Sequence, residues 1–268
     1  MKKIKTALIS VSEKKKLSKL LKTLSKYKIQ IISSGGTFKK IKKLGYKCLE
    51  ISKYTESKEI LNGRVKTLHP KIYAGILSIR KNKSHDKDLK KNNFGKIDLV
   101  IVNFYPFEKS LENTTNHNKI IENIDIGGPA MVRAAAKNFK DVLIITEKND
   151  YSSLINEIKR NKGSTSLNFR KLMSSKAFNL TAYYDSIIAE WFNKKLNIRF
   201  PDKKTLHAKK IEVLRYGENP HQKSSIYSDC LGKQEMGLDK ISGKKLSYNN
   251  YNDIFAGLDI LLSVKKIP

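Results

Sequence analysis

Four side chains of different chemistry lie within six positions of the segment 63–77, "GRVKTLHPKIYAGIL". They are Arg64, Lys66, Thr67 and His69. A guanidinium, an ammonium and a hydroxyl group can together hold a phosphate or polarise a carbonyl group. The alternative is an ordinary surface loop of a lysine-rich chain. His69, which precedes a proline, is expected to have a structural role, although it can still contact a ligand.

A second candidate is the segment 33–37, "SSGGT". A Gly-Gly pair lets backbone N–H groups approach an anion, and Ser34 and Thr37 add hydroxyl groups. The helix predicted to follow points the positive end of its dipole at the same place. This pattern predicts a phosphate site. A Gly-Gly pair after a strand can also be no more than a tight turn.

The third candidate is the segment 121–138, "IENIDIGGPAMVRAAAKN". Asp125 precedes two glycines, where it can cap a helix or take part in chemistry. Arg133 and Lys137 are spaced four residues apart on an alanine-rich helix, so they share a face. Alanines favour close packing, and we expect the ends of these long side chains to reach a defined partner. The alternative for Lys137 is a solvated surface amine.

The elements that would position these residues alternate between strand and helix. Short apolar runs rich in β-branched residues predict buried strands at 4–11, 28–37, 46–52, 96–107 and 141–151. Helices are predicted at 13–27, 37–45 and 125–138. This alternation predicts an α/β fold with a parallel sheet and right-handed crossovers. Ligands of such sheets lie at the carboxyl ends of the strands, where the loops 10–14, 33–37 and 103–107 are expected.

The pattern changes after residue 150. Helices with broad apolar faces are predicted at 151–163 and 167–196, and strand and loop at 197–222. The last residues, 261–268, resemble the end of a helix rather than the edge of a domain. We therefore expect a first domain at 1–148, a helical connecting segment at 149–198, and an incomplete domain at 199–268.

Composition limits the class of protein. A net charge of +29 is compatible with nucleic-acid binding, but the lysines are scattered, and abundant Lys, Asn and Ile together also indicate an AT-rich genome. Cys48 and Cys230 indicate neither a disulfide framework nor a metal site. The apolar stretch near the N-terminus is too short for a signal sequence, and no stretch approaches the length of a membrane span. We expect a cytoplasmic protein without nucleic-acid or membrane partners.

Seven motifs together resemble one known family. In order along the chain they are "SVSEK", "SSGGT", "GRVKTLHPKIYAGIL", "NFYPF", "IENIDIGGPAMVRAAAKN", "LRYGENPHQ" and "LSYNNYNDIFA". The same order is found in the bifunctional purine biosynthesis family, AICAR transformylase/IMP cyclohydrolase, and the resemblance covers essentially the whole chain.

The resemblance implies a methylglyoxal synthase-like first domain and the beginning of an α/β transformylase domain. The first domain would close the ring of FAICAR, a formamidoimidazole carboxamide ribotide, to give IMP and water, with no cofactor and no metal. The transformylase of the family moves a formyl group from 10-formyltetrahydrofolate to AICAR. The family is homodimeric mainly through its transformylase units.

The resemblance also implies roles for single residues. The nucleotide substrate would be held by Ser12, Glu13, Lys14, Ser34, Gly35, Gly36, Thr37, Arg64, Val65, Thr67 and Ile126. Catalysis would involve Lys66, Asn103, Tyr105, Asp125 and Lys137, with Asp125 in proton relay and Lys137 as proton donor and acceptor. Arg215 and Tyr216 match AICAR contacts of the transformylase.

Two features depart from the family pattern. Pro129 is unusual after the glycine pair but tolerable in a first helical turn. The Lys-His pair and the folate site of the transformylase lie beyond the sequence, so we expect ring closure without formyl transfer. The alternatives are a methylglyoxal synthase-like lyase acting on a triose phosphate, a basic nucleic-acid-binding protein, and a non-catalytic remnant.

Overall fold

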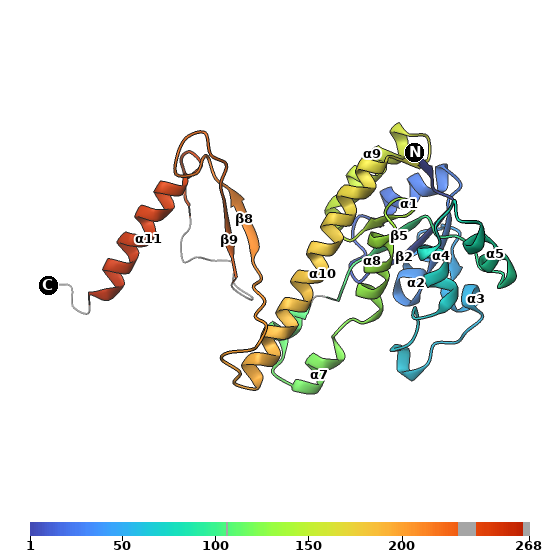
Figure 1. Cartoon of the computed structure of the whole chain (residues 1–268), viewed down its shortest axis with the longest axis horizontal. Coiled ribbons are helices and arrows are strands. Elements are labelled where there is room, and N and C mark those ends of the chain that lie inside the picture. Colours follow the sequence, from blue (N-terminus) through green and yellow to red (C-terminus); the bar gives the residue numbers. More distant parts are fainter. Residues whose placement is uncertain (106, 230–239, 265–268) are drawn as a thin grey trace. The chain divides into compact units, whose positions relative to one another are not determined.

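A computed structural model of the chain describes residues 1–105, 107–229 and 240–264. The chain divides into two compact units (Figure 1). The first comprises residues 1–110 and 114–185, and the second comprises residues 111–113 and 186–268. The division falls inside the predicted connecting segment 149–198 rather than at either of its ends. Cys230 and residues 265–268 lie outside the described residues.

The first unit is built on a five-stranded parallel sheet with the order β4-β3-β2-β5-β6. The strands are β2 (Thr6–Ser10), β3 (Gln30–Ser33), β4 (Leu49–Glu50), β5 (Leu99–Val102) and β6 (Leu143–Ile145). All four residues of β5 and all three of β6 are buried. Continuous apolar runs of this kind are typical of parallel strands covered on both faces. The predicted α/β fold is confirmed, and each strand is shorter than the segment predicted for it.

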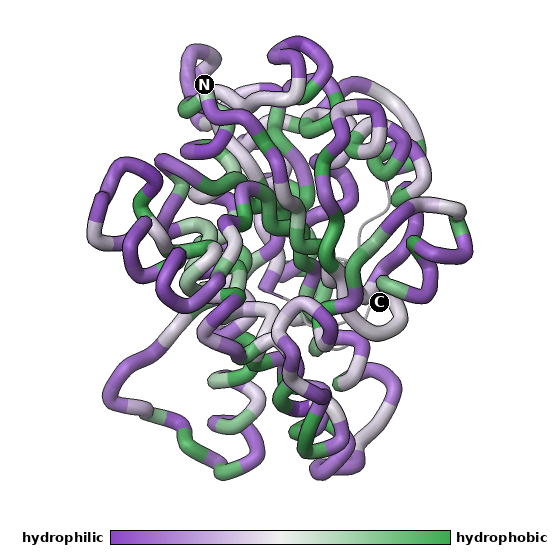
Figure 2. The backbone as a smooth tube through the Cα atoms, turned by 90° about the vertical axis from the view of Figure 1, so that its right-hand side faces the viewer, coloured by the Kyte–Doolittle hydropathy of each residue, from purple (hydrophilic) through white to green (hydrophobic). Residues whose placement is uncertain are grey.

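Helices pack around this sheet, and their buried faces follow the sequence pattern. In α1 (Leu17–Lys26) the leucine stripe Leu17, Leu20, Leu21 and Leu24 is buried. The helices that follow are α2 (Gly35–Lys43), α3 (Ile51–Thr55), α4 (Pro70–Leu77), α5 (Lys83–Lys91), α6 (Phe107–Asn113), α7 (His117–Glu122), α8 (Gly127–Lys137), α9 (Tyr151–Arg160) and α10 (Leu167–Lys195). Helix α1 packs against α9, and α8 packs against α4, β5 and β6. Figure 2 shows the hydrophobic strands in the interior and hydrophilic segments in the outer loops.

Helices α1, α2 and α8 begin at positions that differ from the prediction. Helix α2 begins at Gly35 rather than Thr37, so the Gly-Gly pair forms the first turn of the helix. The helix ends at Lys43, and Gly45, the predicted stop, follows its cap. The φ of Gly45 is +81°, which suits glycine, and its N–H donates to the Lys42 carbonyl oxygen. Pro129 is the third residue of α8, where no intrahelical partner for its missing N–H is required.

Helix α4 was not predicted, although its signals are in the sequence. Pro70 is its first residue, and the His69 Nδ1 accepts a hydrogen bond of 3.1 Å from the Lys71 N–H. His69 is therefore a helix cap, which confirms its structural role. The two-residue strands β1 (Lys2–Lys3) and β7 (Ser164–Thr165) pair antiparallel and were also missed.

The second unit contains less buried structure. Strands β8 (Lys209–Val213) and β9 (Ser225–Ser228) pair antiparallel, and α11 (Tyr248–Ser263) begins at a capping box between Ser247 and Asn250. No residue of α11 is buried. A two-stranded sheet of this size is marginally stable alone.

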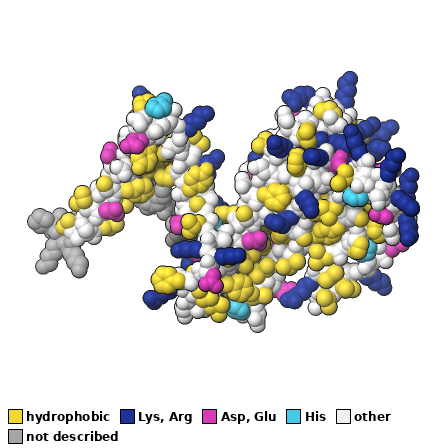
Figure 3. All heavy atoms as spheres, viewed as in Figure 1, with side chains coloured by type: hydrophobic (Ala, Val, Ile, Leu, Met, Phe, Trp, Pro, Cys, Tyr) yellow, Lys and Arg dark blue, Asp and Glu magenta, His cyan; other side chains and the backbone are white. Residues whose placement is uncertain are grey.

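Lysine and arginine side chains are spread over several elements on the face shown in Figure 3. No helix among the residues that the structure describes is both long enough and apolar enough to cross a membrane.

Candidate active site

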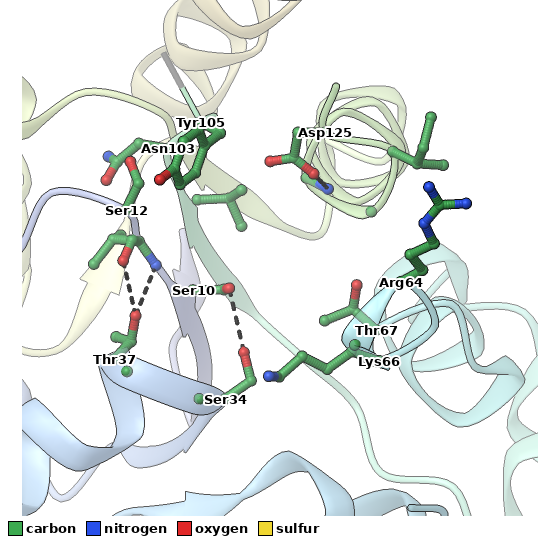
Figure 4. A pocket seen from close by; sticks show the side chains of 18 of the residues that line it. Ser10, Ser12, Ser34, Thr37, Arg64, Lys66, Thr67, Asn103, Tyr105 and Asp125 are labelled. Carbon is green, nitrogen blue, oxygen red and sulfur yellow. Dashed lines mark hydrogen bonds between the residues drawn. The ribbon is translucent and has the colours of Figure 1, made fainter. Parts of the chain in front are cut away.

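An open cavity of about 830 Å³ lies in the first unit, at the carboxyl ends of β2, β3 and β5 (Figure 4). This is the point at which the strand order changes direction, because the chain leaves β2 toward β3 on one side and reaches β5 on the other. Open α/β sheets bind ligands at such a switch point. The cavity therefore lies where the three polar loops were expected to meet.

One end of the cavity is built to hold an anion. The N-terminus of α2 points into it, with Ser34 as the capping position and Gly35 at a φ of +49°. Two ammonium groups lie beside this turn. The Lys66 Nζ is 2.9 Å from the position that a Cβ on Gly35 would occupy, and the Lys14 Nζ is 3.6 Å from the corresponding position at Gly36. Backbone N–H groups, a helix dipole and two cations at one point favour a phosphate.

Hydroxyl groups fix the loops around this end (Figure 4). The Thr37 Oγ1 donates to the Val11 carbonyl oxygen at 2.9 Å and accepts from the Val11 N–H at 3.1 Å, which ties the start of α2 to the loop after β2. The Ser10 and Ser34 Oγ atoms are 3.4 Å apart. These bonds hold the anion-binding end in place before any ligand arrives.

Two cations of the cavity are paired with carboxylates. Lys66 forms an ion pair with Glu59, and Arg64 forms one with Glu122. Hydrogen bonding to the Arg64 guanidinium lowers the pKa of Glu122, and the same bond raises the pKa of Arg64. An incoming anionic ligand would have to compete with both carboxylates for these cations.

The opposite side of the cavity carries Asp125, Asn103 and Tyr105. The Asp125 Oδ1 accepts a hydrogen bond of 2.8 Å from the Gly128 N–H at the start of α8. Burial raises the pKa of Asp125, and the backbone N–H groups of Gly128 and Tyr105 oppose that shift. A half-buried carboxylate with a raised pKa is suited to accept and return a proton.

The start of α8 requires two glycines because side chains of other residues lie very close to its backbone. A Cβ on Gly127 would lie 2.5 Å from the Thr67 Oγ1, and a Cβ on Gly128 would lie 2.4 Å from the Asp125 Oδ2. Any larger residue would displace one of these two side chains. The pair therefore lets the segment that carries Thr67 and the Asp125 carboxylate pack against the helix terminus.

The structure brings most of the expected site residues together. Those that line the cavity are Ser12, Lys14, Ser34, Gly35, Gly36, Thr37, Arg64, Lys66, Thr67, Asn103, Tyr105, Asp125 and Ile126. Lys66 was expected to face the reacting groups, but its ammonium lies at the anion-binding end. The expected residues Glu13, Val65, Lys137, Arg215 and Tyr216 are not among the residues that line the cavity.

Lys137 is separated from Asp125 by the length of α8. It is the last residue of the helix and is exposed. Ten residues of helix span about 15 Å, so the two ends of α8 cannot share one small site. Arg133, four residues earlier, lies over the Phe178 ring, with its Cζ 5.6 Å from the ring centroid. The structure therefore gives no support to a role of Lys137 at the reacting atoms.

The other three residues have different partners. The Glu13 carboxylate pairs with Lys148 at 2.6 Å. Arg215 and Tyr216 belong to the second unit, where the guanidinium lies over the neighbouring ring at 4.9 Å.

The sequence analysis missed Glu59 and Glu122, which neutralise the cations of the site. Glu122 lies inside the candidate segment 121–138 but was not itself expected to contribute to the site. Its partner Arg64 is 58 positions away. Such a pairing has no signal in a single sequence.

Comparison with known proteins finds two matching families. The MGS-like domain family matches residues 16–130, and the AICARFT/IMPCHase bienzyme family matches residues 135–267. The bifunctional purine biosynthesis protein PurH of Bradyrhizobium diazoefficiens is 43% identical over 256 residues, which are 95% of this chain and 48% of the relative. PurH of Clostridium botulinum is 45% identical over 252 residues, 94% of this chain and 50% of the relative.

The solved structure of ForH superimposes with a TM-score of 0.61 at 28% identity, over 70% of this chain and 99% of that one. The chain spans about half the length of the curated relatives it matches. The chain belongs to the AICARFT/IMPCHase bienzyme family, of which it carries the MGS-like domain and an AICARFT/IMPCHase segment.

Proposed function

We propose that the first unit is an IMP cyclohydrolase, which closes the ring of FAICAR to give IMP and water. One observation carries the proposal: a single cavity has at one end a helix N-terminus with two lysines, where a phosphate would bind, and at the other the partly buried carboxylate of Asp125. A ribotide has its phosphate at one end and its reacting groups at the other. The substrate would therefore be oriented by charge before any chemistry takes place.

The reaction joins two groups of the same molecule. The carboxamide nitrogen attacks the formyl carbon, one N–H proton is removed, and the formyl oxygen becomes the hydroxyl group of a tetrahedral carbon. That hydroxyl then leaves as water with a second proton. This proton comes from the N–H of the former formamide nitrogen, which forms the C=N double bond of the product, while the attacking nitrogen keeps its remaining hydrogen. Because both groups belong to one ligand, holding them in register supplies a large part of the rate.

The residues of the cavity divide between binding and chemistry. We assign the phosphate to the turn at Gly35 and Gly36, with Lys14 and Lys66 beside it. At the other end, Asp125 would accept the carboxamide proton and pass it to the formyl oxygen, which later departs as water. Asn103 and Tyr105 would donate hydrogen bonds to the formyl oxygen as charge develops on it. The reaction needs no cofactor.

The binding half of the proposal is tested with Lys14→Met against Lys15→Met. Lys14 lines the cavity, whereas its neighbour Lys15 is exposed and does not. Loss of a charge-assisted contact to phosphate should raise KM for FAICAR about 10- to 100-fold in Lys14→Met. Lys15→Met should leave KM unchanged. Equal effects of the two variants would show that the turn does not hold the phosphate.

A triose phosphate in the same experiment tests the methylglyoxal synthase-like alternative. That reaction would use the same phosphate turn, so turnover of the triose phosphate without turnover of FAICAR would replace the proposal. For the transformylase reaction we expect no formylation of AICAR by the 268 residues with 10-formyltetrahydrofolate. Of the AICAR contacts expected from the family, the chain supplies Arg215 and Tyr216. Formylation by the purified chain would contradict this expectation.

A further inference from the structure

One buried side chain outside the cavity touches both loops that carry the proposed reacting-group residues. Tyr184, on α10, is 6% exposed and does not line the cavity. Its hydroxyl oxygen accepts a hydrogen bond of 2.9 Å from the Asp125 backbone N–H. The backbone segment that carries the Asp125 carboxylate is therefore hydrogen-bonded to Tyr184, which lies 59 positions later in the chain.

The ring of Tyr184 packs against the other loop. Its centroid lies 5.0 Å from that of Phe104, with the planes at 62°, and 6.2 Å from that of Phe107, at 70°. Both are edge-to-face contacts, which aromatic pairs favour. Phe104 stands between Asn103 and Tyr105 in the sequence, so its position fixes where those two side chains start.

The same loop is tied to the anion-binding end. The Ser12 Oγ donates a hydrogen bond of 2.9 Å to the Phe104 carbonyl oxygen. Phe104 thus receives a hydrogen bond from the phosphate side and an aromatic contact from α10. Burial raises the pKa of Tyr184 to about 12, so the side chain remains a neutral phenol at any ordinary working pH.

We propose that Tyr184 is a positioning residue, which sets the distance between Asp125 and the Asn103–Tyr105 loop across the reacting groups. The inference rests on the proposed ring closure. It assigns no contact with substrate to Tyr184. Small errors in the placement of reacting groups cost large factors in rate, so a residue that holds both loops at once controls kcat rather than binding.

The chain offers a matched control on the same helix. The Tyr183 hydroxyl, one position earlier, donates a hydrogen bond of 2.6 Å to the Glu108 Oε1 on α6. Tyr183→Phe and Tyr184→Phe each remove one phenolic hydroxyl and one hydrogen bond from α10. Of the two hydrogen bonds described, the one that Tyr184→Phe removes holds a segment of the cavity, whereas the one that Tyr183→Phe removes does not.

The experiment measures kcat and KM for FAICAR, with thermal unfolding, for the wild type and both variants. We expect Tyr184→Phe to lower kcat about ten-fold with KM within about two-fold, because the phosphate end is intact. Tyr183→Phe should keep the wild-type kcat at a similar melting temperature. Phe107→Leu keeps the hydrogen bond to the Tyr184 hydroxyl and loses the edge-to-face contact with the Tyr184 ring. It should lower kcat less than Tyr184→Phe, and it replaces that variant in the test if Tyr184→Phe does not fold.

The outcomes separate the two proposals. Unchanged kcat in folded Tyr184→Phe or Phe107→Leu, with an active wild type, overturns the positioning role alone. An equal loss of kcat in Tyr183→Phe also overturns it, since the effect would then be general to the helix. A folded wild-type chain that leaves FAICAR unchanged overturns the proposed function and this inference with it.

Discussion

Replacing Gly128 by alanine tests the close approach at the start of α8. A Cβ at this position would lie 2.4 Å from the Asp125 Oδ2, 2.9 Å from its Cγ and 3.0 Å from its Oδ1. Ordinary contacts of a Cβ begin near 3.4 Å, so the carboxylate must retreat by about 1 Å. Gly128 has no positive φ, and the added methyl group itself therefore introduces no backbone strain.

The expected size of the effect follows from this displacement. A shift of about 1 Å in a catalytic group can cost about 10²-fold in rate, so we expect kcat for FAICAR to fall by about two orders of magnitude. Two changes in stability oppose each other. Alanine gains up to about 1 kcal/mol over glycine in a helix, and disturbing the Asp125 hydrogen bond to the Gly128 N–H loses about 1.5–3 kcal/mol. The net loss of about 0.5–2 kcal/mol lowers the melting temperature by only a few degrees.

The assay is absorbance-monitored ring closure of FAICAR, with thermal unfolding of the same samples. Gly257→Ala on α11 is the control, because a Cβ there meets nothing within 4 Å. It should be neutral or slightly stabilising and should keep the wild-type kcat. Folded Gly128→Ala with wild-type kcat would refute the reasoning, since the carboxylate would then tolerate displacement.

Three further changes have defined outcomes. Glu122→Gln frees Arg64 from an exposed ion pair. KM for FAICAR should then fall by at most about five-fold with kcat unchanged. A raised KM would contradict competition between the Glu122 carboxylate and the substrate. The Tyr73 hydroxyl is buried without a hydrogen-bond partner among the described residues. Tyr73→Phe should therefore raise the free energy of unfolding, measured by urea titration, by about 1 kcal/mol. A loss of stability would show that the hydroxyl has a partner. Because burial raises the pKa of Asp125, activity should fall with decreasing pH through a group whose pKa lies above the usual value of about 3.9; an acid limb at or below that value would exclude Asp125 as the base.

The Asp125 shift also has a consequence for stability. The pKa of the Asp125 carboxyl group is higher in the folded protein than in the unfolded chain. Its protonation therefore stabilises the fold. This contribution is fully present below the unfolded pKa and is lost as the pH rises through the folded pKa. At neutral pH the ionised carboxylate therefore costs folding free energy. Asp125→Asn should unfold at a higher temperature than the wild type at pH 7 while losing ring closure. A lower melting temperature would indicate that its hydrogen bonds to the ionised form outweigh burial.

The local elements of the first unit were predictable because their signals are short in range. The leucine stripe of α1 and the apolar run of β5 predicted their buried faces directly. The loops at the strand ends followed from the parallel sheet. The distance of Lys137 from Asp125 could also have been foreseen, since one helix of known rise separates them.

Tertiary pairings were not predictable in the same way. The partners of Arg64 and Asp125, which are Glu122 and Tyr184, lie 58 and 59 positions away. A glutamate on a short helix and a tyrosine in a 29-residue helix carry no mark of such contacts in the sequence. The start of α2 at Gly35 was missed because glycine generally weakens a helix. Here Gly35 is the first residue of the helix, with a φ of +49° that glycine adopts readily.

The most direct test of the account compares FAICAR ring closure by the wild type, Asp125→Asn and Lys137→Ala. We predict that the wild-type chain forms IMP, that Asp125→Asn loses at least about 100-fold in kcat, and that Lys137→Ala stays within about three-fold of the wild type because its side chain lies a helix length away. A folded wild-type chain that does not form IMP, or Asp125→Asn with undiminished kcat, would contradict the central claim.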